Sequence, residues 1–174
     1  MNADEVRLLV SEGEGQTLEF KEAVPKLHTL AERFVGLANK IGGKILVGVS
    51  DKNKIVGFQA SNKLNAQIQN TAKNCKNVRI EIEDIKVEGK NVMVINVSKS
   101  DKLASCSTGY FIREGSITRK MLDEEIKAKM IETGQIIFEE VPPKHEFNFE
   151  RDLDRERFSN YARKAGITIK PQDR

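Results

Sequence analysis

Three acidic residues and one lysine are the side chains in this sequence best suited to chemistry on a phosphodiester. Glu19 and Lys21 alternate with apolar residues, so they share one face of a predicted strand. Glu14 precedes them in a glycine-flanked segment, and Asp51 follows a second predicted strand. Carboxylates are the ligands that Mg²⁺ and Mn²⁺ prefer, and a lysine beside them stabilises phosphoryl charge. We therefore expect the metal ligands Glu14, Glu19 and Asp51, joined by Lys21, to form a catalytic site. The chain has 26 acidic residues, however, so spacing alone leaves ordinary surface charge as an alternative.

Apolar periodicity predicts the elements that must position these side chains. The segment 17–21 alternates as a half-buried strand, and the segment 45–49 is short and apolar, as a central strand would be. Between them, apolar residues recur at helical spacing from Leu27 to Ile41, before Gly42 and Gly43 stop the helix. Further along we expect a returning strand at 55–58, a helix over 64–72, a hairpin of strands 78–82 and 92–97, a loop at 98–109, a strand at 110–113 and a helix over 122–130. This order predicts an α+β fold, with helices packed on a mixed β-sheet.

The end of the chain has a different pattern. Pro142 and Pro143 interrupt it, so we expect a domain over 1–134, a connector over 135–150 and a further region over 151–174. Residues 152–165 favour one helix with an apolar face formed by Phe158, Tyr161, Ala162 and Ala165. That face either docks on the main domain or begins a second one.

Basic residues are unevenly distributed, although the net charge is only +3. They gather in two stretches, 62–79 and 99–120, which are typical of surfaces that hold phosphate. Solvated charge explains each stretch alone equally well. The candidate nucleic-acid contacts are Lys63, Lys73, Lys76, Arg79, Arg113, Arg119 and Lys120.

Several classes of protein are disfavoured by missing patterns. Cys75 and Cys106 lack partners at zinc-binding spacing, so we expect two reduced thiols and no zinc. No phosphate-binding loop of the Gly-x-x-x-x-Gly-Lys-[Ser/Thr] type is present, so no ATP is expected. There is no membrane-length apolar run and no secretory signal, which favours a cytoplasmic protein that does not contact a membrane.

Short motifs follow one another in a specific order along the chain. Glu14 is followed by Glu19-Phe20-Lys21, then by the segments 36–43 and 48–51, and late in the chain by 110–116. This order resembles the Schlafen AlbA-like domain family over residues 5 to 133. The nuclease members of that family use two glutamates and an aspartate for metal-dependent cleavage of RNA or single-stranded DNA. The resemblance implies these roles for Glu14, Glu19 and Asp51.

Together these observations predict a nucleic-acid-binding domain that acts as an endonuclease on single-stranded or structured DNA or RNA with Mg²⁺ or Mn²⁺. The alternative is a non-catalytic DNA-binding domain of a transcriptional regulator, and a third interpretation is a module for assembly. The resemblance also implies two lobes in the nuclease members. A homodimer would supply the second lobe here.

Overall fold

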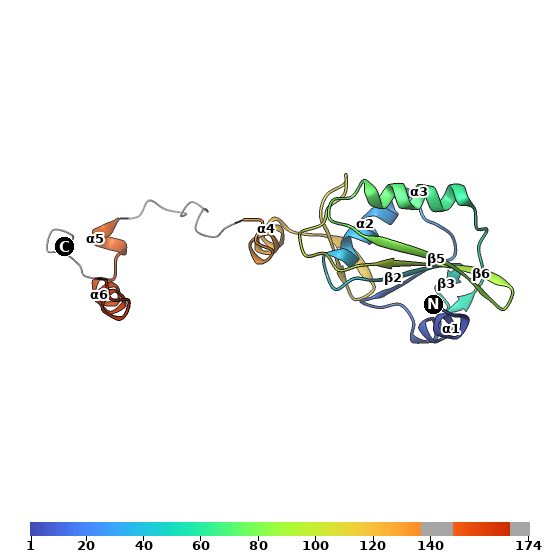
Figure 1. The fold of residues 1–174 in the computed structure, drawn as a ribbon, viewed down its shortest axis with the longest axis horizontal. Helices are drawn as coiled ribbons and strands as arrows, with labels where there is room; N and C mark the ends of the chain where they lie inside the picture. Colours follow the sequence, from blue (N-terminus) through green and yellow to red (C-terminus); the bar gives the residue numbers. More distant parts are fainter. Residues whose placement is uncertain (137–147, 168–174) are drawn as a thin grey trace. The chain divides into compact units, whose positions relative to one another are not determined.

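The computed structural model describes residues 1–136 and 148–167 (Figure 1). The chain divides into two compact units, Met1–Ile137 and Phe138–Arg174. Most of the predicted connector lies outside the described residues, and its boundaries stay predictions.

A four-stranded mixed sheet forms the centre of the first unit. Its order is β1 (Leu18–Lys21), β2 (Gly43–Val47), β6 (Lys90–Val97) and β5 (Ile80–Val87). β1 and β2 are parallel, whereas β6 pairs antiparallel with both β2 and β5. The predicted α+β class with a mixed sheet is confirmed.

Helices cover both faces of this sheet (Figure 1). On one face, α2 (Leu27–Ala38) and α3 (Asn62–Lys73) bury Phe34 and Ile68 against Ile45 and Ile95. On the other face, α1 (Ala3–Glu12) buries Val6 and Val10 against Phe20 and Leu46. The sheet is therefore the middle of three layers, and its strands carry apolar residues on both sides.

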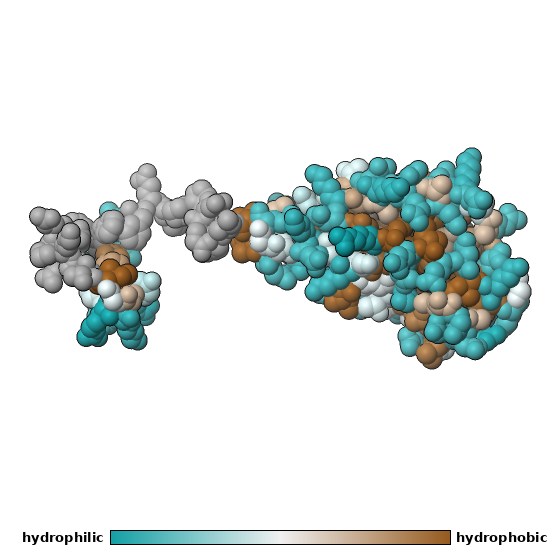
Figure 2. All heavy atoms as spheres, in the orientation of Figure 1, coloured by the Kyte–Doolittle hydropathy of each residue, from teal (hydrophilic) through white to brown (hydrophobic). Residues whose placement is uncertain are grey.

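Short elements outside the central sheet complete the first unit. They are the hairpins of β3 (Val49–Ser50) with β4 (Lys54–Ile55) and of β7 (Phe111–Glu114) with β8 (Ile117–Lys120), and the helix α4 (Asp123–Glu132). Figure 2 shows hydrophilic side chains over most of the visible face of this unit, with apolar patches between them. Within the two described ranges, no helix is both long and apolar enough to cross a membrane.

Three predicted elements differ from the observed ones. The helix from Leu27 ends at Ala38 rather than at Ile41, and the strand expected at 55–58 pairs only at its start. The strand β8 was not predicted. The helix expected over 152–165 is α6 (Arg155–Lys164), and a separate short helix, α5 (Phe149–Asp152), precedes it. The break between them arises because the side chain of Asp154 accepts a hydrogen bond from the amide of Arg157, which begins a new helix.

Candidate nucleic-acid interface

Glu19 is a buried carboxylate surrounded by three cations. The residue is 2% exposed, in the middle of β1. Lys21 Nζ lies 3.0 Å from Glu19 Oε1, and Arg33 Nε lies 3.2 Å from the same oxygen without the alignment of a hydrogen bond. The second oxygen, Oε2, accepts a hydrogen bond from Nη1 of Arg113. Both carboxylate oxygens of Glu19 therefore already contact basic side chains.

Arg113 is fully buried, so its predicted contact with nucleic acid is wrong. Besides Glu19, its guanidinium binds the carbonyl oxygens of Gly15 and Leu18, at 3.0 Å and 3.2 Å from Nη2. In return, Gln16 Nε2 donates to the carbonyl of Arg113 at 2.8 Å. Arg113 thus joins β7 to the segment around β1. The fixed fork of donors in arginine suits such a buried, many-partner position.

The other predicted catalytic residues lie in different surroundings. Lys21 Nζ is 3.7 Å from Glu14 Oε1, and that oxygen also accepts the amide of Phe20 at 2.6 Å. Asp51 is exposed in the turn between β3 and β4. The structure therefore brings Glu14, Glu19 and Lys21 together, but does not gather Asp51 with them into a metal-holding group. Over 1–136 and 148–167, no group of three or more His, Cys, Asp or Glu side chains is placed to hold a metal ion.

This arrangement does not fit a divalent cation. A metal at Glu19 would compete with three basic side chains for two buried oxygens, and like charges so close together repel strongly. The metal and catalytic assignments of Glu14, Glu19 and Asp51 gain no support from this geometry and stay predictions.

The segment 36–43, which carries part of the family resemblance, performs a packing role. The amide of Asn39 is buried, donates to the carbonyls of Ala104 and Phe111 at 3.0 Å and 2.8 Å, and accepts the amide of Ala104 at 2.7 Å. A Cβ placed on Gly43 would lie 2.4 Å from the carbonyl oxygen of Thr17. Glycine is needed there because β1 approaches the start of β2 too closely for a side chain.

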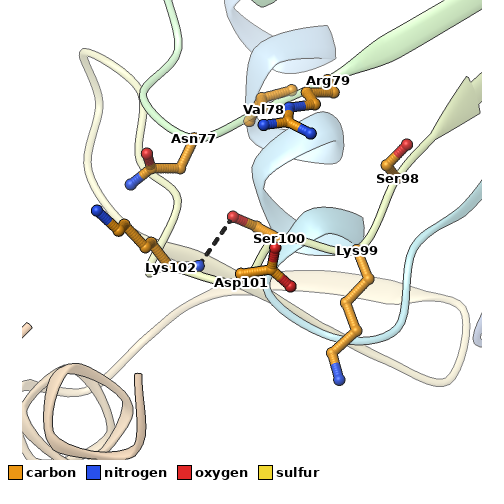
Figure 3. Close-up of a pocket in the computed structure, with 8 residues that line it drawn as sticks. All are labelled: Asn77, Val78, Arg79, Ser98, Lys99, Ser100, Asp101 and Lys102. Carbon is orange, nitrogen blue, oxygen red and sulfur yellow. Dashed lines mark hydrogen bonds between the residues drawn. The ribbon is translucent and has the colours of Figure 1, made fainter. Parts of the chain in front are cut away.

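A basic cleft lies near the start of β2, between the segment that enters β5 and the segment that leaves β6. It has a volume of about 330 Å³. The Ser98 amide donates to the Arg79 carbonyl at 3.1 Å, and Asn77 Nδ2 donates to the Leu103 carbonyl at 2.9 Å, so the two walls are held together. In Figure 3, Arg79 and Lys102 approach from different sides, whereas Lys99 points away from the other side chains. The residues that line the cleft are Asn77, Val78, Arg79, Ser98, Lys99, Ser100, Asp101 and Lys102.

The cations of this cleft are available for a ligand. Arg79, Lys99 and Lys102 are exposed, and none forms an ion pair with another described residue. Among the described residues of the lining, Asp101 is the one acid that opposes these cations. Of the predicted contacts, Arg79 lines the cleft, and Lys76 immediately precedes the lining residue Asn77 in the chain. Lys99 and Lys102 belong to the predicted basic stretch but were not among the candidate contacts.

The remaining predicted contacts differ in how far their charge is compensated. Lys63, Lys73 and Lys120 are exposed and form no ion pair within the described parts of the chain. Arg119 instead lies between two carboxylates, with Nη2 at 2.6 Å from Glu114 and 2.7 Å from Glu125. Hydrogen bonds from Arg119, and then from the amide of Leu122, lower the pKa of Glu125 to about 2. The charge of Arg119 is thus largely neutralised within the protein.

The protein-family model described as Schlafen, AlbA_2 matches residues 14–122. The chain belongs to this family. The matched residues include the basic cleft and the Glu19 cluster, which consists of Glu19, Lys21, Arg33 and Arg113. Membership of the Schlafen AlbA_2 family implies binding to nucleic acid. The predicted family is confirmed, over a somewhat shorter range than expected.

Comparisons with individual proteins add the fold alone. No curated protein matches the chain. The crystal structure of the DIP2311 protein from Corynebacterium diphtheriae aligns with a TM-score of 0.54 and 21% sequence identity. The alignment covers 67% of this chain and 27% of DIP2311, so the Schlafen AlbA_2 chain spans about a quarter of the length of that protein.

Proposed function

We propose that this Schlafen AlbA_2 domain binds single-stranded nucleic acid through phosphate contacts in the basic cleft, without cutting it. The observation that carries the proposal is the pair of cations Arg79 and Lys102 at one cavity, with Lys99 on its lining, none of which pairs with an acid among the described residues. The hydroxyl groups of Ser98 and Ser100 line the same cavity and can donate to phosphate oxygens. Phosphate contacts of this kind supply most of the affinity of sequence-independent binding.

The size and lining of the cleft favour a single strand. Its volume of about 330 Å³ is at the small end of ligand-binding pockets, which suits one nucleotide better than a rigid duplex. None of the described residues that line it is aromatic. Base stacking therefore contributes little there, and we expect weak dependence on sequence.

Fluorescence anisotropy with a labelled single-stranded oligonucleotide tests this proposal. Arg79→Ala and Lys102→Ala should each weaken binding to all sequences alike. Each should also reduce the slope of log affinity against log salt concentration by about 1, the amount expected for one lost phosphate contact. Lys127→Ala is the matched control, because it removes an exposed positive charge outside the cleft. Equal affinities for all three variants would overturn the cleft as the binding site.

A metal-dependent endonuclease is the second candidate function. It is supported by the position of Lys21 between Glu14 and Glu19, at 3.7 Å and 3.0 Å from their carboxylates. Endonuclease activity requires the carboxylate of Glu19 to break its contacts with Arg113 and Arg33 before it can bind a metal ion. For that reason we place binding without cleavage first. This corresponds to the alternative stated from the sequence, a non-catalytic DNA-binding domain of a transcriptional regulator.

Assembly is a separate part of the proposal. A two-fold homodimer would place two clefts on one particle and raise the affinity for a strand long enough to reach both. Light scattering, with and without an oligonucleotide, measures whether the domain dimerises. A monomer at micromolar concentration would leave single-cleft binding as the whole interaction.

A further inference from the structure

Cys75 and Cys106 flank a short antiparallel contact on the same side. Lys76 and Ser105 exchange both backbone hydrogen bonds, at 2.8 Å and 3.2 Å, and form an antiparallel bridge. In such a pairing the residue before one partner faces the residue after the other. The bridge is isolated: Cys75 follows the C-cap of α3 directly, and Cys106 turns back to pair with Gly109. In a regular antiparallel ladder, residues in the positions of Cys75 and Cys106 would face each other with Cα atoms about 4.5 Å apart.

The surroundings of the two thiols agree with this position. Cys75 is buried in the core between α2, α3 and the sheet, and Cys106 is partly buried against the same cluster. Burial, followed by the nearby Cys106, raises the pKa of the Cys75 thiol to about 11. The Cα separation of a facing pair without hydrogen bonds lies within the range that a disulfide spans.

We propose that Cys75 and Cys106 are a redox-sensitive pair that forms a reversible disulfide within one chain. The oxidant is a small-molecule disulfide such as oxidised glutathione. The Cys106 thiolate, which is the more accessible, attacks one sulfur of the oxidant and releases a glutathione thiolate.

The second step closes the bond within the protein. The released thiolate takes the proton of Cys75, whose sulfur attacks Sγ of Cys106 and expels the second glutathione as a thiolate, which water protonates. The protein loses two electrons and two protons, and the oxidant becomes two thiols. The new bond crosslinks the chain on either side of the basic cleft, because Cys75 precedes Asn77 and Cys106 follows Lys102.

The test treats the reduced full chain with excess oxidised glutathione at low protein concentration. We expect both thiols to disappear without retained glutathione mass, and peptide mapping to recover one crosslink between Cys75 and Cys106. Closing the intervening loop restricts the unfolded chain, so Tm should rise by roughly 5–10 °C and return to its starting value with a reductant. In Cys75→Ser, glutathione should remain attached to Cys106, because the second thiol is missing.

Three results would overturn the proposal: two thiols that stay free, stable glutathione adducts in the wild-type protein, or a crosslink between chains. The wild-type mass and peptide map decide this even if a serine variant does not fold. The outcome is also independent of the proposed function, because no nucleic acid enters the measurement.

Discussion

The guanidinium of Arg113 and the carboxylate of Glu19 form an ion pair whose side chains are 0% and 3% exposed. The two residues are 94 positions apart in the chain, yet they join β7 to β1 directly. Each belongs to a motif on which the Schlafen resemblance rests. At these two positions the motifs therefore meet in a contact that holds the fold together.

Replacing Glu19 by Gln should destabilise the domain strongly. The change leaves Arg113 buried without its counter-charge, and breaking one partner of a buried pair costs about 3–5 kcal/mol. Urea unfolding followed by circular dichroism measures the loss in free energy of unfolding. Glu22→Gln, at an exposed position on the same segment, should change it by less than about 0.5 kcal/mol. Equal stability of the two variants would mean that the Glu19 cluster contributes nothing to the fold.

Divalent metal should not support cleavage by the isolated chain. Both oxygens of Glu19 already contact basic side chains, so Mg²⁺ or Mn²⁺ has no free site there. Labelled single-stranded DNA and RNA, incubated with each metal or with EDTA, provide the measurement. We expect intact substrate and unchanged binding in every case. Cutting that EDTA abolishes, and that both Glu14→Gln and Asp51→Asn remove, would instead establish the endonuclease.

The contact between Arg119 and Glu125 should make stability depend on pH in the acid range. Because the pKa of Glu125 is lowered from 4.5 to about 2, the folded state binds its proton less readily than the unfolded state does. The stabilisation is therefore complete above about pH 5 and is lost as the pH falls towards 2. Tm across this range should fall less in Glu125→Gln than in the wild type. Glu124→Gln, a neighbouring exposed acid, should follow the wild type.

Gly43→Ala should disturb the pairing of β1 with β2. Its Cβ would lie 2.4 Å from the carbonyl oxygen of Thr17 and 2.9 Å from the side chain of Leu37, so the backbone must shift. Overpacking of this kind costs about 1–3 kcal/mol. Gly15→Ala is the matched control, because nothing lies within 4 Å of its added Cβ. Equal Tm values for the two variants in thermal unfolding would contradict the close approach of Thr17 to Gly43.

The elements with strong apolar periodicity were predictable from sequence. The strands around Phe20, Ile45 and Val94 and the helix around Phe34 all lie in the core. Helix α1 was missed because its core contact rests on two valines in a highly charged segment. The start of α1 could nonetheless have been predicted from the sequence, because Asn2 and Glu5 have the spacing of the capping box that they form.

The site was less predictable, because burial of a charge depends on distant partners. Nothing near Arg113 in sequence indicates that Glu19 will bind it. The cleft, by contrast, follows from a predicted element: in the β5–β6 hairpin, Ile80 pairs with Val97, so the residues just outside these two must be neighbours. Antiparallel pairing of the predicted hairpin is thus enough to bring Arg79 close to Ser98 and Lys99.

The hydrogen bonds of Asn39 have a consequence for the covalent continuity of the chain. Its amide holds Ala104 and Phe111, and between these two lie the exposed residues Ser107 and Thr108. A protease that cuts this exposed peptide leaves the C-terminal fragment bound through Phe111 to Asn39 of the N-terminal fragment. The nicked domain should therefore survive as a two-piece complex, and the halves, expressed separately, are suited to reassembly as a split protein.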